Sequence, residues 1–161
     1  MQILVDADAC PVKKVIVSIA EEYSLGVVML IDTSHMLDDG YSRVITVDKA
    51  RDGVDIALIN LAKRGDIVVT QDFGLAALAL GKGAFAINQN GLVFSGDNMD
   101  KLLFERFLGQ KIRRAGGRTT NPGKRGKEDD MRFEAAFRKM VASAVAKDSG
   151  QQSGRDEAKD G

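Results

Sequence analysis

Ile3-Leu4-Val5-Asp6-Ala7-Asp8 opens the chain with a short apolar run that ends in two aspartates. A continuous apolar run of this length is typical of a strand that is buried on both faces of a sheet. Apolar residues at helical spacing begin directly after Pro11, a residue that is tolerated where a helix starts. The opening stretch therefore predicts a strand that runs into a crossover helix, which is the repeating unit of a parallel sheet.

The same alternation continues along the chain. Apolar strand patterns occur at 27–31, 43–47, 66–70 and 84–87, and a short one at 92–94 follows the turn signal Asn90-Gly91. Helical spacing of apolar residues occurs at 52–64, 74–80, 98–114 and 129–146. Strands separated by helices predict an α/β fold, a three-layer α/β/α domain with a mainly parallel central sheet of about four to five strands.

The 161 residues fit one domain. We assign the domain to residues 1–146, and we expect the polar, glycine-rich residues 147–161 to be a disordered tail.

The chain has 23 basic and 23 acidic residues, so its zero net charge removes any whole-chain indication of nucleic-acid binding. Cys10 is the only cysteine and there is one histidine, which excludes an internal disulfide and a structural zinc site. We find no secretory signal and no membrane-spanning stretch, and we expect a cytoplasmic protein.

The charge is nevertheless unevenly distributed. Residues 1–109 carry 10 basic and 15 acidic side chains, whereas residues 110–127 carry seven basic side chains and no acidic one. The basic, glycine-rich segment 111–127 has too little apolar surface to fold alone, and we expect it to stay mobile until a partner orders it. It either follows the phosphates of a nucleic acid or serves as a solubilising linker, and the residues favour neither.

Carboxylates follow two of the predicted strands. Asp6 and Asp8 lie two residues apart after the first strand, so an extended backbone points them to the same side. Asp72 follows the strand at 66–70, while Asp52 and Asp55 share one face at the start of a helix. If the two strands are neighbours, these carboxylates converge on one crevice at the carboxyl edge of the sheet.

Carboxylates in one crevice repel each other unless a cation lies among them. Hard divalent ions such as Mg²⁺ or Mn²⁺ prefer oxygen ligands, and bound ions would activate water for phosphodiester cleavage. We therefore predict a Mg²⁺ or Mn²⁺ site formed by five aspartates: Asp6, Asp8, Asp52, Asp55 and Asp72. Four of them, without Asp52, are the candidate catalytic residues. Each aspartate alone could equally be a helix cap or a turn residue, Asp52 above all.

Four further residues are candidates for binding substrate phosphate. Lys13 lies in the first turn of the first helix, and Thr70 ends the strand at 66–70. Arg113 and Arg114 begin the basic segment. A solvated lysine and an ordinary β-branched strand residue are the alternative interpretations of Lys13 and Thr70.

The stretch Asp6-Ala7-Asp8-Ala9-Cys10-Pro11-Val12-Lys13 closely resembles the opening motif of the YaiI/YqxD family of small bacterial proteins. The resemblance covers residues 1–146 and includes Asp52-Gly53-Val54-Asp55 and Gly65-Asp66-Ile67-Val68-Val69-Thr70-Gln71-Asp72. Phe73-Gly74 departs from the Ile-Pro pair expected after the second motif. This difference alters the start of a helix, but it does not affect any proposed metal ligand.

The family in turn resembles the PIN-like superfamily, whose better-known members are Mg²⁺- or Mn²⁺-dependent ribonucleases. Asp6, Asp55 and Thr70-Gln71-Asp72 match the superfamily pattern of an acid after strand one, an acid in a central helix and a T-x-D motif. The resemblance implies a PIN-like fold and a nuclease that acts on RNA or another phosphodiester. It does not imply a particular substrate.

Two other functions remain open. A phosphatase of the haloacid-dehalogenase type also begins with Asp-x-Asp, and Gly96-Asp97-Asn98-Met99-Asp100 resembles its later acidic motif, although the spacing is one residue short and no cap domain fits in the length. A non-catalytic RNA-binding module is the other alternative, but a carboxylate cluster would disfavour contact with a polyanion.

Overall fold

The computed structural model describes residues 1–32, 36–49, 53–117 and 123–157, with side chains up to 153. Six strands form one sheet in the order β3-β2-β1-β4-β5-β6. All neighbouring strands are parallel except β5 and β6, which form an antiparallel hairpin at the edge. The strands are β1 (Gln2–Asp6), β2 (Gly26–Asp32), β3 (Arg43–Val47), β4 (Ile67–Val69), β5 (Phe85–Ile87) and β6 (Val93–Phe94).

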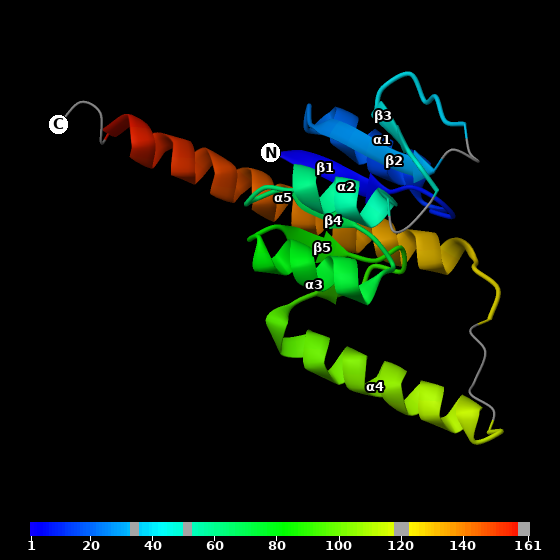
Figure 1. Cartoon of the computed structure of the whole chain (residues 1–161). Helices are drawn as coiled ribbons and strands as arrows, with labels where there is room; N and C mark the ends of the chain where they lie inside the picture. The colour runs from blue at the N-terminus through cyan, green and yellow to red at the C-terminus, as the bar shows by residue number, and fades with distance from the viewer. Residues whose placement is uncertain (33–35, 50–52, 118–122, 158–161) are drawn as a thin grey trace.

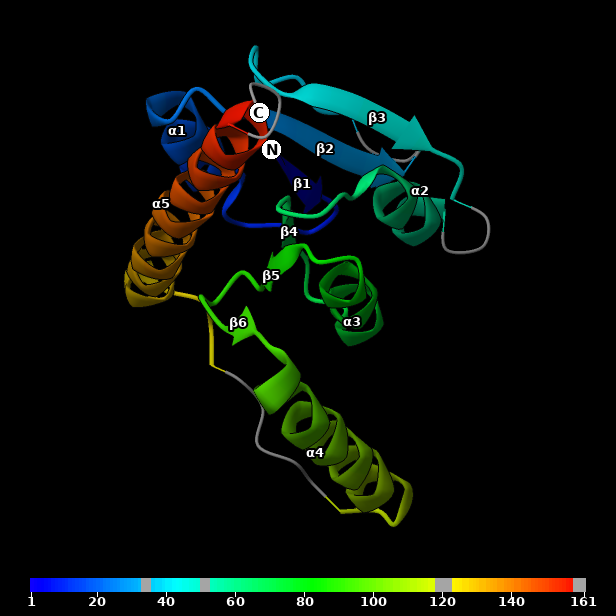
Figure 2. The same ribbon diagram turned by 90° about the vertical axis from the view of Figure 1, so that its left-hand side faces the viewer.

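Helices cover both faces of this sheet (Figures 1 and 2). One face packs against α1 (Lys13–Glu22) and α5 (Lys127–Glu157), and the other packs against α2 (Gly53–Leu61) and α3 (Phe73–Gly81). The remaining helix, α4 (Gly96–Arg114), projects from the body beyond α3. The predicted three-layer α/β/α fold with a mainly parallel sheet is therefore confirmed. The sheet has six strands, not four to five, because the short segment after Asn90-Gly91 also pairs.

Alternation of side chains along the buried strands creates two apolar cores. Ile3 and Val5 of β1 face the core beneath α1 and α5, while Leu4 between them faces the core beneath α2 and α3. All three side chains are fully buried. A strand with apolar residues on both faces fits only the middle of such a sheet, as the opening stretch predicted.

The strand order reverses direction between β1 and β4. The chain runs from β1 outward through β2 to β3 and then returns to place β4 on the other side of β1. Val5 pairs with Val69 in parallel register, so the residues that follow both strands meet at one edge of the sheet. Crevices at such reversal points are the usual ligand sites of open parallel sheets.

The last helix docks through stacked aromatic rings. Phe133 and Phe137 are completely buried, and their ring centroids lie 5.1 Å apart. Arg138 pairs with Glu22 and so links α5 to α1. The helix continues past residue 146, where we predicted a disordered tail, as far as Glu157; residues 158–161 lie outside the described part. Forming the first turn is the unfavourable step in helix formation, and the docked part of α5 supplies that turn. Polar residues can therefore extend the helix beyond residue 146.

None of the helices in the described part of the chain is both long and apolar enough to cross a bilayer.

Candidate active site

Asp6 is the central carboxylate of the site. It is the last residue of β1, and its Oδ2 accepts a hydrogen bond of 3.1 Å from the hydroxyl group of Thr70, which follows the neighbouring strand β4. Burial raises the pKa of Asp6 from 3.8 to about 6; the Thr70 hydrogen bond opposes this rise, and the negative charges of Asp55, Asp8 and Asp72 add to it. Asp6 is therefore itself poorly solvated, and three other carboxylates lie near enough to affect its ionisation.

Asp8 lies in the tight loop between β1 and α1. Its Oδ2 accepts a hydrogen bond of 3.0 Å from the backbone N–H of Asp32 at the end of β2. Ala9, the next residue, has a positive φ of 56°, a conformation that costs energy for a residue with a Cβ atom. This turn sends the chain away into α1 and leaves Asp8 at the carboxyl edge of the sheet.

Asp72 begins α3 and serves as its N-cap. Its Oδ1 accepts a hydrogen bond of 2.9 Å from the N–H of Leu75, and its own N–H donates one of 3.0 Å to Oγ1 of Thr70. The Thr70 hydroxyl group thus contacts both Asp6 and Asp72. Asp72 is therefore both a helix cap and a neighbour of Asp6 in the pocket. The two roles are compatible because Oδ1 accepts the capping hydrogen bond and the second carboxylate oxygen is not needed for it.

Asp55 completes the carboxylate cluster from the first turn of α2. It lines a pocket next to the site, together with Asp72, and its charge raises the pKa of Asp6 more than those of Asp8 and Asp72 do. Asp52, the fifth predicted ligand, lies outside the described residues. Four of the five predicted carboxylates therefore gather where β1 and β4 end.

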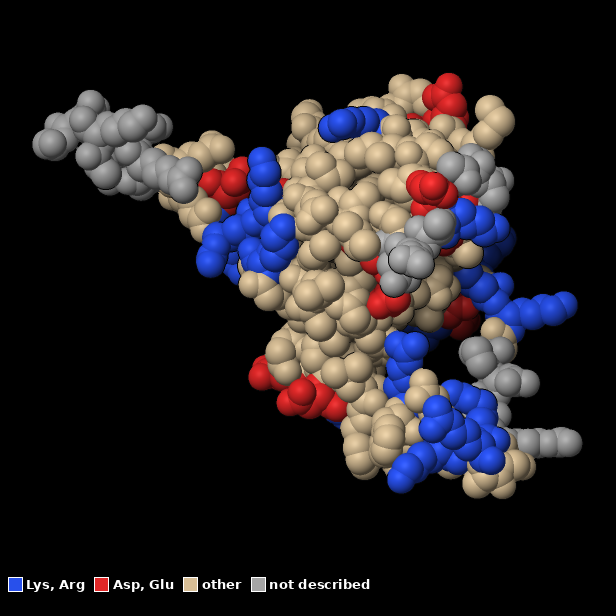
Figure 3. All heavy atoms as spheres, in the orientation of Figure 1, with Lys and Arg blue, Asp and Glu red and all other residues tan. Residues whose placement is uncertain are grey.

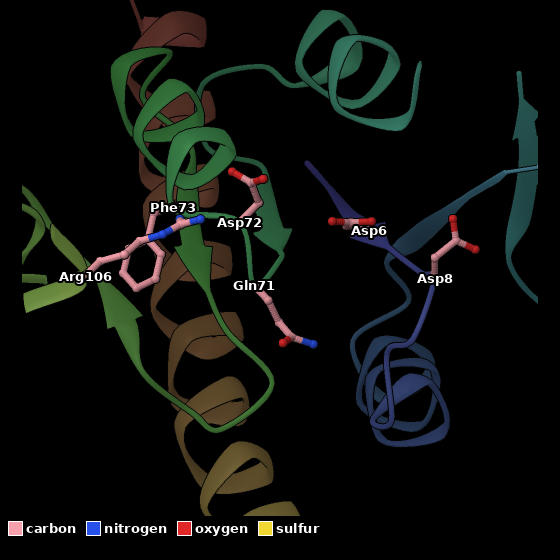
Figure 4. A pocket seen from close by; sticks show the side chains of 6 residues that line it. All are labelled: Asp6, Asp8, Gln71, Asp72, Phe73 and Arg106. Atoms are coloured by element: carbon pink, nitrogen blue, oxygen red, sulfur yellow. The ribbon is translucent and has the colours of Figure 1, made fainter. Parts of the chain in front are cut away.

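An open pocket of about 400 Å³ lies over this cluster, lined by Asp6, Asp8, Gln71, Asp72, Phe73 and Arg106. Figure 4 shows Arg106 and Phe73 on one side, Asp72 next to them, and Asp6 and Asp8 farther across. Gln71 bonds to the side chain of Gln89, which links this pocket residue to the turn after β5.

Arg106 is a site residue that the sequence did not indicate. Its guanidinium group lies 5.6 Å from the centroid of the Phe73 ring, and Phe73 in turn contacts Phe94 edge to face. Nothing distinguishes Arg106 within the charged pattern of α4. Phe73, at the position where the resemblance departs from the family motif, supplies the ring on which Arg106 rests.

Three predicted phosphate-binding residues do not line the pocket. The ammonium group of Lys13 donates to the backbone carbonyls of Cys10 at 3.0 Å and Ala7 at 3.4 Å, inside the β1–α1 loop. Arg113 and Arg114 lie in the last turn of α4, well beyond Arg106. The fourth candidate, Thr70, is 2% exposed and donates its hydroxyl hydrogen to Asp6. Thr70 therefore positions carboxylates, and its contact with substrate stays a prediction.

The basic segment 111–127 has no single structure. Residues 111–114 are helical in α4, residues 118–122 lie outside the described part, and Arg125 is firmly attached to the body. Arg125 donates to Asp130, to the side chain of Asn90 and to the carbonyl of Gln89. This arginine is bound to the turn after β5 and does not extend into solvent as a phosphate-tracking arm would.

The donor set is suited to a hard divalent cation. Every donor is a carboxylate, and the negative charges of Asp55, Asp8 and Asp72 add to the effect of burial in raising the pKa of Asp6. Within residues 1–32, 36–49, 53–117 and 123–157, no group of three or more acidic, histidine or cysteine side chains lies close enough together to hold a metal ion between them. Mg²⁺ commonly retains several waters and uses only one or two carboxylates, so this spread arrangement fits such an ion.

Comparison with known proteins gives the family. A family model described as “Uncharacterized BCR, YaiI/YqxD family” matches residues 4–143. This chain belongs to the YaiI/YqxD family. The family match includes every residue that lines the pocket and ends within α5.

Curated relatives in the YaiI/YqxD family are named UPF0178 protein. The one from Ruminiclostridium cellulolyticum is 68% identical over 137 residues, covering 85% of this chain and 90% of the relative. The one from Clostridium kluyveri is 50% identical over 148 residues, covering 91% and 97%. The one from Natranaerobius thermophilus is 46% identical over 141 residues, covering 88% and 96%. No solved structure matches the chain significantly.

Proposed function

We propose that this protein is a Mg²⁺- or Mn²⁺-dependent hydrolase of phosphodiester bonds, with RNA as the expected substrate. The observation that carries the proposal is the convergence of Asp6, Asp8, Asp55 and Asp72 at the point where the sheet order reverses. The match of Asp6, Asp55 and Asp72 to the PIN-like pattern supports the same chemistry.

The proposed roles follow from the contacts. Asp6, Asp8 and Asp72 would hold the cation, in part through its bound waters, with Asp55 beside them, and a bound cation would supply charge neutralisation and a water with a lowered pKa. Thr70 keeps the carboxylate of Asp6 oriented through its hydrogen bond. Arg106, held on the ring of Phe73, brings a positive charge to the pocket, where it would bind a phosphate oxygen.

An extended substrate suits the surroundings of the pocket. The pocket is open to solvent, and Figure 1 places the C-terminal end of α4 on the side of the molecule where β1 ends. Lysine and arginine side chains gather at that end of α4 (Figure 3). A phosphodiester chain that leaves the pocket toward this end would therefore meet positive charge.

The haloacid-dehalogenase alternative finds little support. The segment Gly96-Asp97-Asn98-Met99-Asp100, which it requires near the first aspartates, forms the start of α4 behind the N-cap Ser95. Asp97 and Asp100 are exposed and do not line the carboxylate pocket.

The test is metal-dependent cleavage of labelled oligonucleotides by the purified full chain. Single-stranded RNA, double-stranded RNA and single-stranded DNA are incubated with Mn²⁺ or Mg²⁺, and parallel samples contain EDTA. We expect RNA cleavage that EDTA stops and that both Asp6→Asn and Asp72→Asn abolish. The control Glu21→Gln makes the same carboxylate-to-amide change on an exposed face of α1 and keeps full activity. Cleavage that persists equally in the site variants, or no cleavage together with no Mn²⁺-dependent rise in Tm, would refute the proposal.

A further inference from the structure

The outward face of α4 carries an apolar stripe with no cover among the described residues. Five large apolar side chains of this helix are between 41% and 60% exposed: Leu103, Phe104, Phe107, Leu108 and Ile112. Monomeric soluble proteins seldom expose so many large apolar groups together, and such a patch commonly marks a site of protein association.

The body contacts only the other side of the helix. Met99 is buried in the core beneath α3, Leu102 packs beside it, and Arg106 faces the carboxylate pocket. At 100° per residue these three positions fall within an arc of about 60°, and the centre of the apolar stripe lies about 160° away from the centre of that arc. Leu103 borders the contacting side, and the remainder of the stripe points away from the pocket and from the body.

Charges of opposite sign flank the stripe on the same face. Asp97 and Asp100 lie at its N-terminal end, and Lys111 and Arg114 lie at its C-terminal end. Figure 3 shows acidic side chains at one end of α4 and basic side chains at the other. With 3.6 residues per turn, these four charges and the apolar positions 103, 104, 107 and 108 all fall within an arc of about 140°.

The order of residues on this face is self-complementary. When two copies of α4 are placed antiparallel about an axis between positions 105 and 106, Asp100 lies opposite Lys111 and Phe104 lies across from Phe107 near the centre line of the face. Asp97 lies level with Arg114, and Leu103 level with Leu108, toward the two edges of the face. Each match occurs twice, as in any isologous contact with two-fold symmetry. We propose that this face of α4 binds a second copy of the chain in an antiparallel arrangement.

A parallel dimer and a nucleic acid both fit this face of α4 less well than an antiparallel dimer does. A parallel pair would place acid against acid and base against base, which opposes association. A single-stranded nucleic acid could stack on the phenylalanines, but the acidic residues at the N-terminal end would repel it. One helix face buries less than the roughly 800 Å² per partner of a standard interface, so we expect a dimer that dissociates on dilution. Arg106 lies on the other side of α4, and the pocket stays open in the dimer.

The first test is the oligomeric state of the full chain. Sedimentation equilibrium from about 1 to about 300 µM should show a monomer–dimer equilibrium for the wild type. Phe104→Glu should raise the dissociation constant at least about tenfold, because it places two buried charges near the axis. Met131→Glu makes a comparable change at an exposed position of α5 and should leave the equilibrium unchanged. Circular dichroism confirms that both variants are folded.

The second test identifies the antiparallel pairing. Asp100→Lys and Lys111→Glu should each weaken self-association, because each places like charges opposite one another twice. Their equimolar mixture should restore dimers, because both cross-pairs are then of opposite sign. A wild type that stays monomeric over the whole range, a dimer that Phe104→Glu leaves intact, or variants that fail to complement each other would overturn the proposal. Loss of single-stranded RNA binding in Phe104→Glu, with a monomeric wild type, would assign the face to nucleic acid instead.

Discussion

The Thr70 hydroxyl group donates a hydrogen bond to the Asp6 carboxylate across the β1–β4 strand pair. A hydrogen bond to the charged form lowers the pKa of a carboxyl group, so Thr70 limits the rise that burial produces. The same hydroxyl oxygen accepts from the N–H of Asp72. One buried side chain thus sets both the ionisation of the central carboxylate and the position of its neighbour.

Thr70→Val should therefore raise the pKa of Asp6 above its value of about 6. The pH at which Mn²⁺ binding is half-maximal should move upward, because the metal requires the ionised carboxylate. The variant should also lose about 0.5–1.5 kcal/mol of stability, since the partly buried N–H of Asp72 loses its acceptor. Calorimetric titration with Mn²⁺ at several pH values and urea unfolding measure the two effects. Thr70→Ser keeps the hydroxyl group and should resemble the wild type, and identical pH profiles for valine and serine variants would contradict the assigned role.

The raised pKa of Asp6 predicts how stability depends on pH when no metal is present. The folded protein holds the Asp6 proton up to about pH 6, whereas the unfolded chain releases it near 3.8. Between these values the folded state binds more protons, so the Asp6 contribution to stability decreases as pH rises and is constant above about 6. In EDTA, Asp6→Asn should remove this contribution and give a higher Tm than the wild type at pH 7. A difference in Tm between the two proteins that does not change from pH 4 to pH 7 would contradict the prediction.

The strand ends of this fold were predictable from the sequence because their signal is local. An apolar run followed by an acid identified Asp6 and Asp72, and the rule for parallel sheets placed them at one edge. The structure confirms that edge, with β1 and β4 as direct neighbours. Asp66 lies at the opposite end of β4, where it accepts hydrogen bonds from the N–H groups of Gln2 and Lys63 and stabilises the turn that precedes the strand.

Other site residues depend on tertiary contacts that no sequence period reports. Arg106 reaches the pocket only because α4 packs beside Phe73. Lys13 occupies the predicted first turn, but its side chain bends back to the loop carbonyls. Arg125 looked like part of a mobile basic arm, yet three of its hydrogen bonds fix it to the body. Composition describes a segment as a whole and cannot say which of its charges finds a partner.

The docking of α5 predicts that substitutions of two residues of this helix will differ sharply in their effect on the free energy of unfolding. Phe137→Ala removes a completely buried ring that stacks on Phe133 and should cost about 3–5 kcal/mol. Met131→Ala removes an apolar side chain that is 67% exposed, and it should change stability by no more than about 0.5 kcal/mol. Urea unfolding followed by circular dichroism gives both values. Similar losses in the two variants would show that α5 is not docked through its aromatic face.

Arg106 is expected to affect substrate binding and not the fold. Arg106 is exposed and contacts the ring of Phe73, so Arg106→Ala should leave Tm nearly unchanged. If the guanidinium group binds phosphate, the same variant should raise KM for RNA about tenfold or more, and Arg106→Lys should recover part of this loss. The control Lys101→Ala removes an exposed charge from the same helix outside the pocket. Equal KM values for Arg106→Ala and Lys101→Ala would remove Arg106 from the site.

Asp72 has two roles that substitution can separate. One role is the cap of α3, in which Oδ1 accepts from the N–H of Leu75, and the other is a negative charge in the pocket. Asp72→Asn keeps a good capping side chain and removes only the charge, so the metal-free protein should be at least as stable as the wild type. Asp72→Ala removes both and should lose about 0.5–2 kcal/mol.

The two variants should nevertheless respond alike to metal. Mn²⁺ stabilises a protein by binding its folded state, so both variants should lose most of the Mn²⁺-dependent rise in Tm. Ser95→Ala is the matched control, because it removes the cap of α4 and touches no carboxylate of the pocket. It should lower Tm as Asp72→Ala does and keep the full response to Mn²⁺. If Asp72→Asn keeps that response as well, Asp72 is only a helix cap, and the metal site must be sought among the remaining carboxylates.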